Sequence, residues 1–135
     1  MAIVEPASVI KLHADITQQI MDAASRVHQA LGSGFLEKVY ENALAIELEE
    51  AGLSVQRQVA IDVRYRGRNV GSFIADLLVA QCVIVEIKAL DGLSPVPEVQ
   101  LVNYLRATPV EVGLLINFGH RLAIKRRIFT NDRKT

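Results

Sequence analysis

Residues 82–88 read Cys82-Val83-Ile84-Val85-Glu86-Ile87-Lys88, an almost continuous apolar run that two charges interrupt. Such a run is typical of a strand that is covered on both faces of a sheet. Glu86 and Lys88 are two positions apart, so their side chains point to the same face. Burying either charge is costly unless it finds a partner or a metal ion. The run therefore predicts a central strand that carries a charged cluster.

The segment before this run has one charge of its own, Asp76, between apolar neighbours from Phe73 to Val79. A short loop around Ala80 joins the two segments as an antiparallel hairpin, and its length places Asp76 opposite residues 85–87. Asp76 and Glu86 then become near neighbours. Two carboxylates beside a lysine suit a hard divalent cation such as Mg²⁺. An ion pair of Lys88 with either acid is the structural alternative.

Two helices are expected before the strands. Apolar residues recur at helical spacing up to Leu31, and Asp15 with Gln18 resembles a capping box at the start of the first helix. The second helix should begin near Leu36 or Glu37 and stop at Gly52, a plausible C′ glycine. Its apolar positions are Val39, Ala43, Leu44, Ile46 and Leu48.

From residue 55 the sequence becomes rich in β-branched residues and short turns. Residues 55–65, 69–79 and 83–89 predict an antiparallel meander of three strands. Ser94 as N-cap and Pro95 as first helical residue predict a third helix to about Ala107. Two more strands follow at 112–118 and 122–129, the first after a connection long enough for a parallel crossover. We therefore expect an α/β fold with a mixed central sheet flanked by helices, in the order αα-βββ-α-ββ.

The chain has 135 residues, of which 50% are hydrophobic and 22% charged, and this favours one globular domain over residues 1–135. Residues 1–13 and 130–135 are expected to be loosely ordered. No apolar run approaches the length of a membrane span and the start lacks a signal peptide, so a soluble, cytoplasmic protein with no membrane partner is expected. A lone Cys82 leaves carboxylate or imidazole as metal ligands.

Charge divides unevenly along the chain. Three bases stand against eight acids up to Ser54, and twelve bases stand against seven acids beyond it. The basic half allows local contacts with the phosphates of a nucleic acid. Its basic residues equally fit a solvated hairpin and a protected edge strand. They are Arg57, Arg64, Arg66, Arg68, Arg121, Lys125, Arg126 and Arg127.

Asp76 with Glu86-Ile87-Lys88 resembles the catalytic core of the PD-(D/E)XK nuclease superfamily, with Ala75 where a proline often stands. The segment from Gly34 through Glu37 to Tyr40 resembles the signature of the GxxExxY protein family, a branch of that superfamily. The resemblance extends over residues 16–129. Further matching segments are Gln56-Arg57-Gln58, Leu93-Ser94-Pro95, Gln100 to Tyr104 and Gly113 to Gly119.

The resemblance implies that Asp76 and Glu86 are ligands of Mg²⁺ or Mn²⁺ and that Lys88 is the catalytic lysine. Glu37 resembles the helical acid that many such nucleases add as a ligand, although an acid in a first helical turn also complements the helix dipole. His28 resembles a helical histidine that some RecB-type nucleases use as a further ligand. A packed or solvent-facing histidine is its structural alternative.

Gln100 and Tyr104 are four residues apart and share one helix face. They resemble the Q-x-x-x-Y element of RecB-type nucleases, whose residues contact substrate or orient the lysine. Alternatively, Tyr104 is a core aromatic residue and Gln100 a surface amide.

The resemblance thus implies a metal-dependent nuclease that cleaves phosphodiester bonds, with DNA favoured over RNA. The alternative is a non-hydrolytic module that keeps the nuclease fold and binds nucleic acid or docks onto a partner. A homodimer or a larger complex is compatible with either function.

Overall fold

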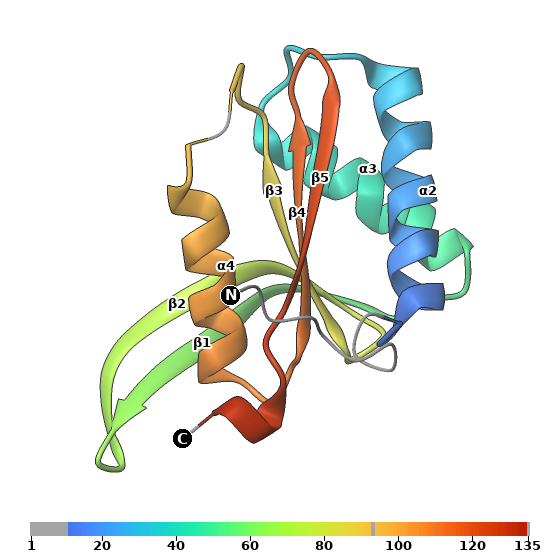
Figure 1. Ribbon diagram of the computed structural model, residues 1–135. Helices are drawn as coiled ribbons and strands as arrows, with labels where there is room; N and C mark the ends of the chain where they lie inside the picture. Colours follow the sequence, from blue (N-terminus) through green and yellow to red (C-terminus); the bar gives the residue numbers. More distant parts are fainter. Residues whose placement is uncertain (1–10, 93, 135) are drawn as a thin grey trace, which may run out of the picture.

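The computed structural model describes residues 11–92 and 94–134 (Figure 1). Its elements follow the predicted order αα-βββ-α-ββ, with a short final turn of 3₁₀ helix. They are α2 (Ala14–Leu31), α3 (Glu37–Glu50), β1 (Val55–Tyr65), β2 (Arg68–Val79), β3 (Val83–Lys88), α4 (Val96–Ala107), β4 (Val112–Phe118), β5 (Leu122–Ile128) and η1 (Asn131–Arg133).

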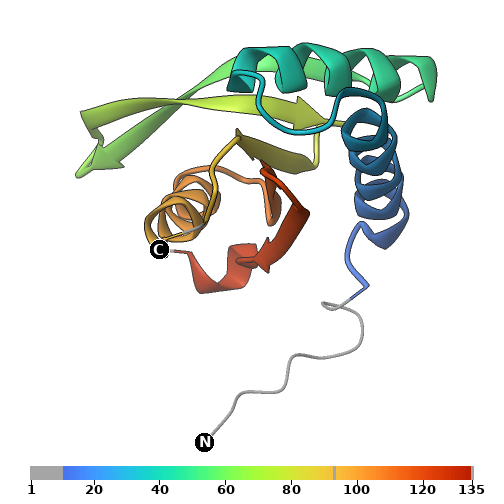
Figure 2. The ribbon, with the colours of Figure 1, turned by 90° about the horizontal axis from the view of Figure 1, so that it is seen from above.

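The five strands form one mixed sheet in the order β1-β2-β3-β4-β5. β3 and β4 are parallel, and the other neighbouring pairs are antiparallel. α2 and α3 cover one face and α4 covers the other, as Figure 2 shows. The mixed sheet flanked by helices that the sequence predicts is therefore confirmed.

β3 is buried along almost its whole length, between helices on both faces of the sheet. Val85 packs into the core beneath α2 and α3, whereas its neighbour Ile84 packs into the core beneath α4. Alternation along the strand then directs Glu86 and Lys88 to the face of Ile84, toward α4. Glu86 is only 8% exposed. The sequence prediction of a strand covered on both faces is confirmed.

β1 and β2 are much longer than β3, the next strand of the sheet. β2 pairs with β3 only through Leu77, Leu78 and Val79, and the rest of β1 and β2 extends beyond the sheet as a two-stranded ribbon (Figure 1). Arg66 and Gly67 both have positive φ at the tip, as a tight hairpin turn requires. The ribbon arches past α4, so it forms a second wall beside that helix.

The helix caps differ from the sequence predictions. α2 has His13 as N-cap without a side-chain cap bond, and Gln18 Nε2 instead donates to Asp22 Oδ1, so the predicted capping box is wrong. α4 has Pro95 rather than Ser94 as its N-cap. Pro97 is tolerated in the first turn because an amide there needs no helical partner.

The buried face of α3 matches the predicted apolar positions only in part. Leu44 and Leu48 are buried, whereas Val39 and Ile46 are exposed. Tyr40 and Glu41 are buried as well, so α3 presents a carboxylate, together with apolar side chains, to the sheet. This orientation brings Glu41 toward the site described below.

Residues 130–134 are better anchored than the expected loose end. The Asn131 amide donates to Glu111 Oε2 at 2.7 Å, and the Lys134 ammonium donates to the carbonyl oxygens of Thr108 and Val110. The predictions for residues 1–10 and 135, and the part of the family resemblance that falls on Leu93, lie outside the described residues. Within the described ranges, no helix is long and apolar enough to cross a membrane.

Candidate active site

β2 and β3 separate immediately after the Leu77–Val85 pair, and two carboxylates occupy the point of separation. The Asp76 amide donates to Glu86 Oε1 at 3.0 Å, and the Ile87 amide donates to Asp76 Oδ2 at 2.8 Å. Each carboxylate thus accepts a hydrogen bond from the opposite strand that a backbone carbonyl of its own strand would accept in a continued ladder. The hairpin register predicted from the sequence is confirmed, and it brings Asp76 and Glu86 together.

β1 is distorted at the residue opposite Asp76. The β1–β2 ladder pairs Arg57 with Leu77 and Val59 with Ala75, and it passes over Gln58, whose φ is +53°. A left-handed non-glycine residue within a strand costs about 1 to 3 kcal/mol and is retained where the surroundings require it. Here the Gln58 amide nitrogen donates to Glu41 Oε1 at 2.7 Å. The distortion therefore ties β1 to α3 beside Asp76.

The two carboxylates titrate abnormally because they are buried together. Burial raises the pKa of Glu86 to about 8, and the charge of Asp76 adds to this effect. Burial also raises the pKa of Asp76, with a further increase from the charge of Glu41. The Ile87 amide and the charge of Lys88 act in the opposite direction on Asp76. A cation between the acids would stabilise the doubly ionised form.

We expect metal-free protein to lose stability as pH rises from 4.5 to about 8 because of Glu86. In this window the unfolded chain releases the Glu86 proton while the folded protein retains it. The stability that the protonated carboxyl contributes is complete below the unfolded pKa and is lost as pH reaches the folded pKa. Its slope is about 1.4 kcal/mol per pH unit.

Urea unfolding in chelator at several pH values measures this contribution. The side chain introduced by Glu86→Gln cannot ionise, so the free energy of unfolding of this variant should not fall with pH in the way that ionisation of Glu86 makes the wild type fall. Asp22→Asn, an exposed change on α2, serves as the matched control and should follow the wild type. Parallel pH profiles for wild type and Glu86→Gln would contradict the burial of an ionisable pair.

A cavity of about 540 Å³ opens beside Asp76 on the α3 side of the sheet. Glu37 lies exposed at its rim, and Glu41 lies buried in its wall. The residues that line it are Phe35, Leu36, Glu37, Lys38, Glu41, Gln58, Asp76, Ile87 and Ala89. The structure thus places the predicted Glu37 near the acid pair, in the same cavity as Asp76.

Glu41 is a site residue that the sequence analysis missed. Burial alone would raise its pKa, but hydrogen bonds from Arg57 and Lys38, both 2.9 Å long, hold the pKa below its usual value. The carboxylate therefore stays ionised beside Asp76. Its position one helical turn after Glu37, and three and four residues before the apolar Leu44 and Ala45, was the available sequence signal.

The signature around Glu37 has a structural basis. The Tyr40 hydroxyl donates to the Gly32 carbonyl at 2.6 Å and accepts from the Phe35 amide, and its ring stacks on Phe118 with centroids 4.6 Å apart. Gly34 has a φ of +107°, which favours glycine. Tyr40 and Gly34 together fix the turn that presents Glu37 at the cavity rim.

Lys88 ends β3 close to both acids without touching them. No ion pair within 4.0 Å joins it to Asp76 or Glu86 among the described residues, so the alternative of a contact ion pair is not found. Its charge still opposes the rise in the pKa of both carboxyls. Asn117 holds the following chain through two hydrogen bonds with the backbone of Leu90. The ammonium group is therefore left available to a ligand.

Gln100 and Tyr104 approach the acids from α4. Gln100 Nε2 donates to the Tyr104 hydroxyl at 2.8 Å. Burial raises the pKa of Tyr104, and the charge of Glu86 adds to it, so this hydroxyl lies within electrostatic reach of the acid pair. Tyr104 is buried and Gln100 is exposed, as the structural alternative describes, while the Tyr104 hydroxyl lies on the side of the acids.

His28 lies apart from this group. Its Nε2 is 2.9 Å from the Gly119 carbonyl oxygen, and its ring lies beside Phe118. It does not line the cavity at Asp76. Within residues 11–92 and 94–134, no three His, Cys, Asp or Glu side chains are placed to hold a metal ion together. Asp76 and Glu86 are therefore the direct donor pair; Glu37 lines the cavity at Asp76 without joining them in a three-ligand cluster, and His28 does not line that cavity.

Comparisons with known proteins agree with this geometry. The family model of the PD-(D/E)XK nuclease superfamily matches residues 14–128. Among solved structures, the protein designated SSO0001 is similar with a TM-score of 0.56 and 16% identity, over 92% of this chain and 63% of that one. This chain therefore spans under two thirds of that protein's length.

A second similar structure is an alkaline exonuclease, LHK-Exo, from Laribacter hongkongensis. Its TM-score is 0.53 with 15% identity, over 96% of this chain and 73% of that one. At such identities the likeness shows the fold. No curated protein sequence matches this chain.

Proposed function

This chain belongs to the PD-(D/E)XK nuclease superfamily, and we propose from this membership and from its site that it is a metal-dependent nuclease acting at Asp76, Glu86 and Lys88. The observation that carries the proposal is the pair of carboxylates at the opening between β2 and β3, each of which accepts a hydrogen bond from a backbone amide of the opposite strand. A buried acid and a half-buried one, both with raised pKa values, are costly to maintain unless function requires them. Among the described residues, the nearby Lys88 forms no contact ion pair.

The donor set fits Mg²⁺ or Mn²⁺. Members of this superfamily typically use divalent metal ions. Mg²⁺ commonly binds proteins through only one or two carboxylates, with water and substrate phosphate completing its shell. In the described part of the chain, backbone amides occupy only one oxygen of Asp76 and one of Glu86. The second oxygen of each group is the proposed ligand.

Each residue then has a distinct task. When bound, the metal ion supplies Lewis-acid chemistry, which polarises a phosphoryl oxygen and acidifies water. Lys88 orients the attacking water or stabilises negative charge on the phosphate. Glu37 reaches the site from the rim through water. Gln100 and Tyr104 position the substrate from α4.

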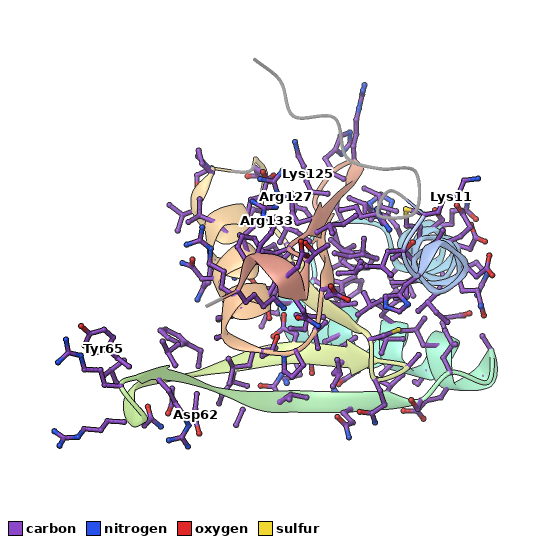
Figure 3. All side chains as sticks on the ribbon, turned by 60° about the horizontal axis from the view of Figure 1, so that its bottom comes forward. Lys11, Asp62, Tyr65, Lys125, Arg127 and Arg133 are labelled. Atoms are coloured by element: carbon purple, nitrogen blue, oxygen red, sulfur yellow. The ribbon has the colours of Figure 1, made fainter. Side chains whose placement is uncertain are left out.

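We further propose that the chain belongs to the GxxExxY branch and that DNA is its substrate rather than RNA. The turn held by Gly34 and Tyr40 supports the branch, because it gives a reason for two of the three signature residues. The choice of DNA rests on the family resemblance, because basic side chains suit the phosphates of DNA and RNA alike. Such side chains lie at the ribbon, near the labelled Tyr65 in Figure 3, and around η1. There Arg106, Arg127 and Arg133 line one hollow.

A cleavage screen tests the proposed function. Labelled single-stranded, duplex and branched DNA and RNA are incubated with the protein and Mg²⁺, Mn²⁺ or chelator. We expect DNA cleavage that requires metal and stops in chelator. Binding without cleavage under every metal condition would favour the non-hydrolytic module, and faster cleavage of RNA would overturn the choice of DNA.

A further inference from the structure

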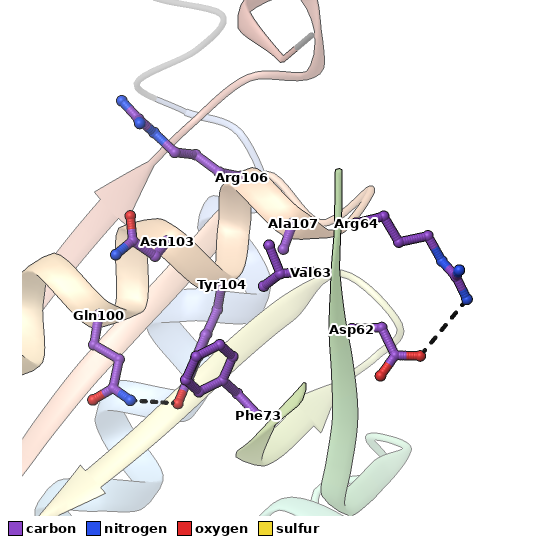
Figure 4. A pocket seen from close by; sticks show the side chains of 9 residues that line it. All are labelled: Asp62, Val63, Arg64, Phe73, Gln100, Asn103, Tyr104, Arg106 and Ala107. Carbon is purple, nitrogen blue, oxygen red and sulfur yellow. Dashed lines mark hydrogen bonds and ion pairs between the residues drawn. The ribbon is translucent and has the colours of Figure 1, made fainter. Parts of the chain in front are cut away.

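A second and larger cavity lies between the β1–β2 ribbon and α4, with a volume of about 650 Å³ (Figure 4). Pockets of this size commonly hold small organic ligands. The acids do not line it, and its walls come from two elements far apart in the sequence. The lining residues are Asp62, Val63, Arg64, Phe73, Gln100, Asn103, Tyr104, Arg106 and Ala107.

The lining has the chemistry that recognises a nucleobase. Phe73 from the ribbon and Tyr104 from α4 bring two aromatic rings together, with centroids 5.9 Å apart and planes tilted by 43°. Phe73 is 43% exposed, so its ring still has surface to offer a ligand. Asn103 and Gln100 add amide groups that can donate to and accept from base edges.

Two arginines, Arg64 of the ribbon and Arg106 of α4, are also among the lining residues. Figure 4 shows both side chains extending away from the two aromatic rings of the cavity. Arg64 makes a long contact of 3.9 Å with Asp62, and Arg106 lies over the Phe129 ring. These two cations suit the phosphates of a strand that runs outside the cavity.

Tyr104 connects this cavity with the acid pair. Its ring lines the cavity, and its hydroxyl, which accepts from Gln100, is the end that senses the charge of Glu86. Tyr104 therefore belongs to the wall of the cavity and also lies within electrostatic reach of the acids, which do not line the cavity themselves.

We propose that this cavity binds one unpaired nucleobase of the strand that is cut. Bases in a duplex are stacked on one another and must be unstacked before a side chain can face them. The protein would thus act on single strands, frayed ends or extruded nucleotides in preference to intact duplex. This inference rests on the proposed function and names its substrate class.

The first test measures binding of a fluorescent single-stranded DNA by anisotropy in chelator, where no cleavage occurs. Phe73→Ala should weaken affinity about 5- to 150-fold, the range for loss of one stacked base. Ile74→Ala is the matched control, because Ile74 follows Phe73 on the same strand, is exposed and does not line the cavity. The control should retain affinity within about twofold.

The second test needs no protein variant and covers the case in which Phe73→Ala is unfolded. Removing one base at a time from the strand should reveal a position at which the abasic strand binds wild type more weakly by a similar factor. In folded Phe73→Ala, the same base loss should have little further effect. Equal affinity for every abasic strand, or equal losses in Phe73→Ala and Ile74→Ala, would overturn the inference.

These outcomes separate the cavity from the catalytic proposal. Metal-dependent cleavage with no effect of base loss would remove the base-binding inference alone. A clear effect of base loss without cleavage under any metal would remove the nuclease proposal and leave the binding site standing. Stronger binding of intact duplex than of single strands would also contradict an unpaired base in the cavity.

Discussion

Lys88→Ala is expected to lower metal-dependent cleavage by about 10²- to 10³-fold, the usual loss when a positioned group that stabilises transition-state charge is removed. Lys88 sits at the end of β3, near Asp76 and Glu86, yet forms no contact ion pair with either. Its ammonium is therefore available to a phosphate or to water. Single-turnover cleavage at saturating Mn²⁺ measures the loss.

Two further variants make this result specific. Lys88→Met keeps most of the side-chain volume and should be as inactive as Lys88→Ala. Lys11→Ala removes an exposed lysine before α2 and should cleave like the wild type. Activity of both Lys88 variants near the wild-type level would show that this lysine has no catalytic role.

Asp76→Asn is expected to abolish cleavage and the stabilisation by Mn²⁺ without harming the metal-free fold. The asparagine oxygen can still accept from the Ile87 amide, as Asp76 Oδ2 does. The like charge that raises the pKa of Glu86 disappears. The free energy of unfolding in chelator should therefore stay unchanged or rise by about 1 kcal/mol, because the change removes a repulsion between two carboxylates that only function requires.

A purely structural role for Asp76 makes the opposite prediction. If Asp76 compensated a buried Lys88, its neutralisation would strand that charge and cost about 3 to 5 kcal/mol. Thermal melts of both proteins, with chelator and with Mn²⁺, distinguish the two cases. A large loss of stability in chelator, with no response of wild type to Mn²⁺, would contradict a metal site.

The sheet and its acid pair were predictable from the sequence because they depend on local patterns. Apolar runs and turn residues place each strand within about one residue at its ends. The short loop at Ala80 and Gln81 fixes the register, and register alone makes Asp76 and Glu86 neighbours. Burial of Glu86 follows because the strand that carries it is covered on both faces.

Other parts of the site depend on tertiary contacts that no local pattern specifies. Gln58 has a left-handed backbone without being Gly or Asn, and its reason lies in Glu41 on another element. Glu41 looks like a solvated helical charge until α3 is turned to face the sheet. The cavity at Phe73 and Asn103 needs the ribbon and α4 to be placed side by side.

His28 shows the limit of residue-by-residue transfer from a family. Its helix and its spacing before Gly34 are compatible with a ligand role, but its ring nitrogen lies against the Gly119 carbonyl oxygen. The packed alternative that the sequence allowed describes this arrangement. A direct metal role for His28 therefore receives no support from its position.

The most direct measurement is a titration of Mn²⁺ into wild type and Asp76→Asn with an end-labelled single-stranded DNA, following the initial rate of cleavage. We expect a saturable rise in rate for the wild type, full reversal by chelator, and no rise for the variant. Equal rates for the two proteins, or cleavage that persists in chelator, would contradict metal-dependent hydrolysis at the Asp76 and Glu86 pair.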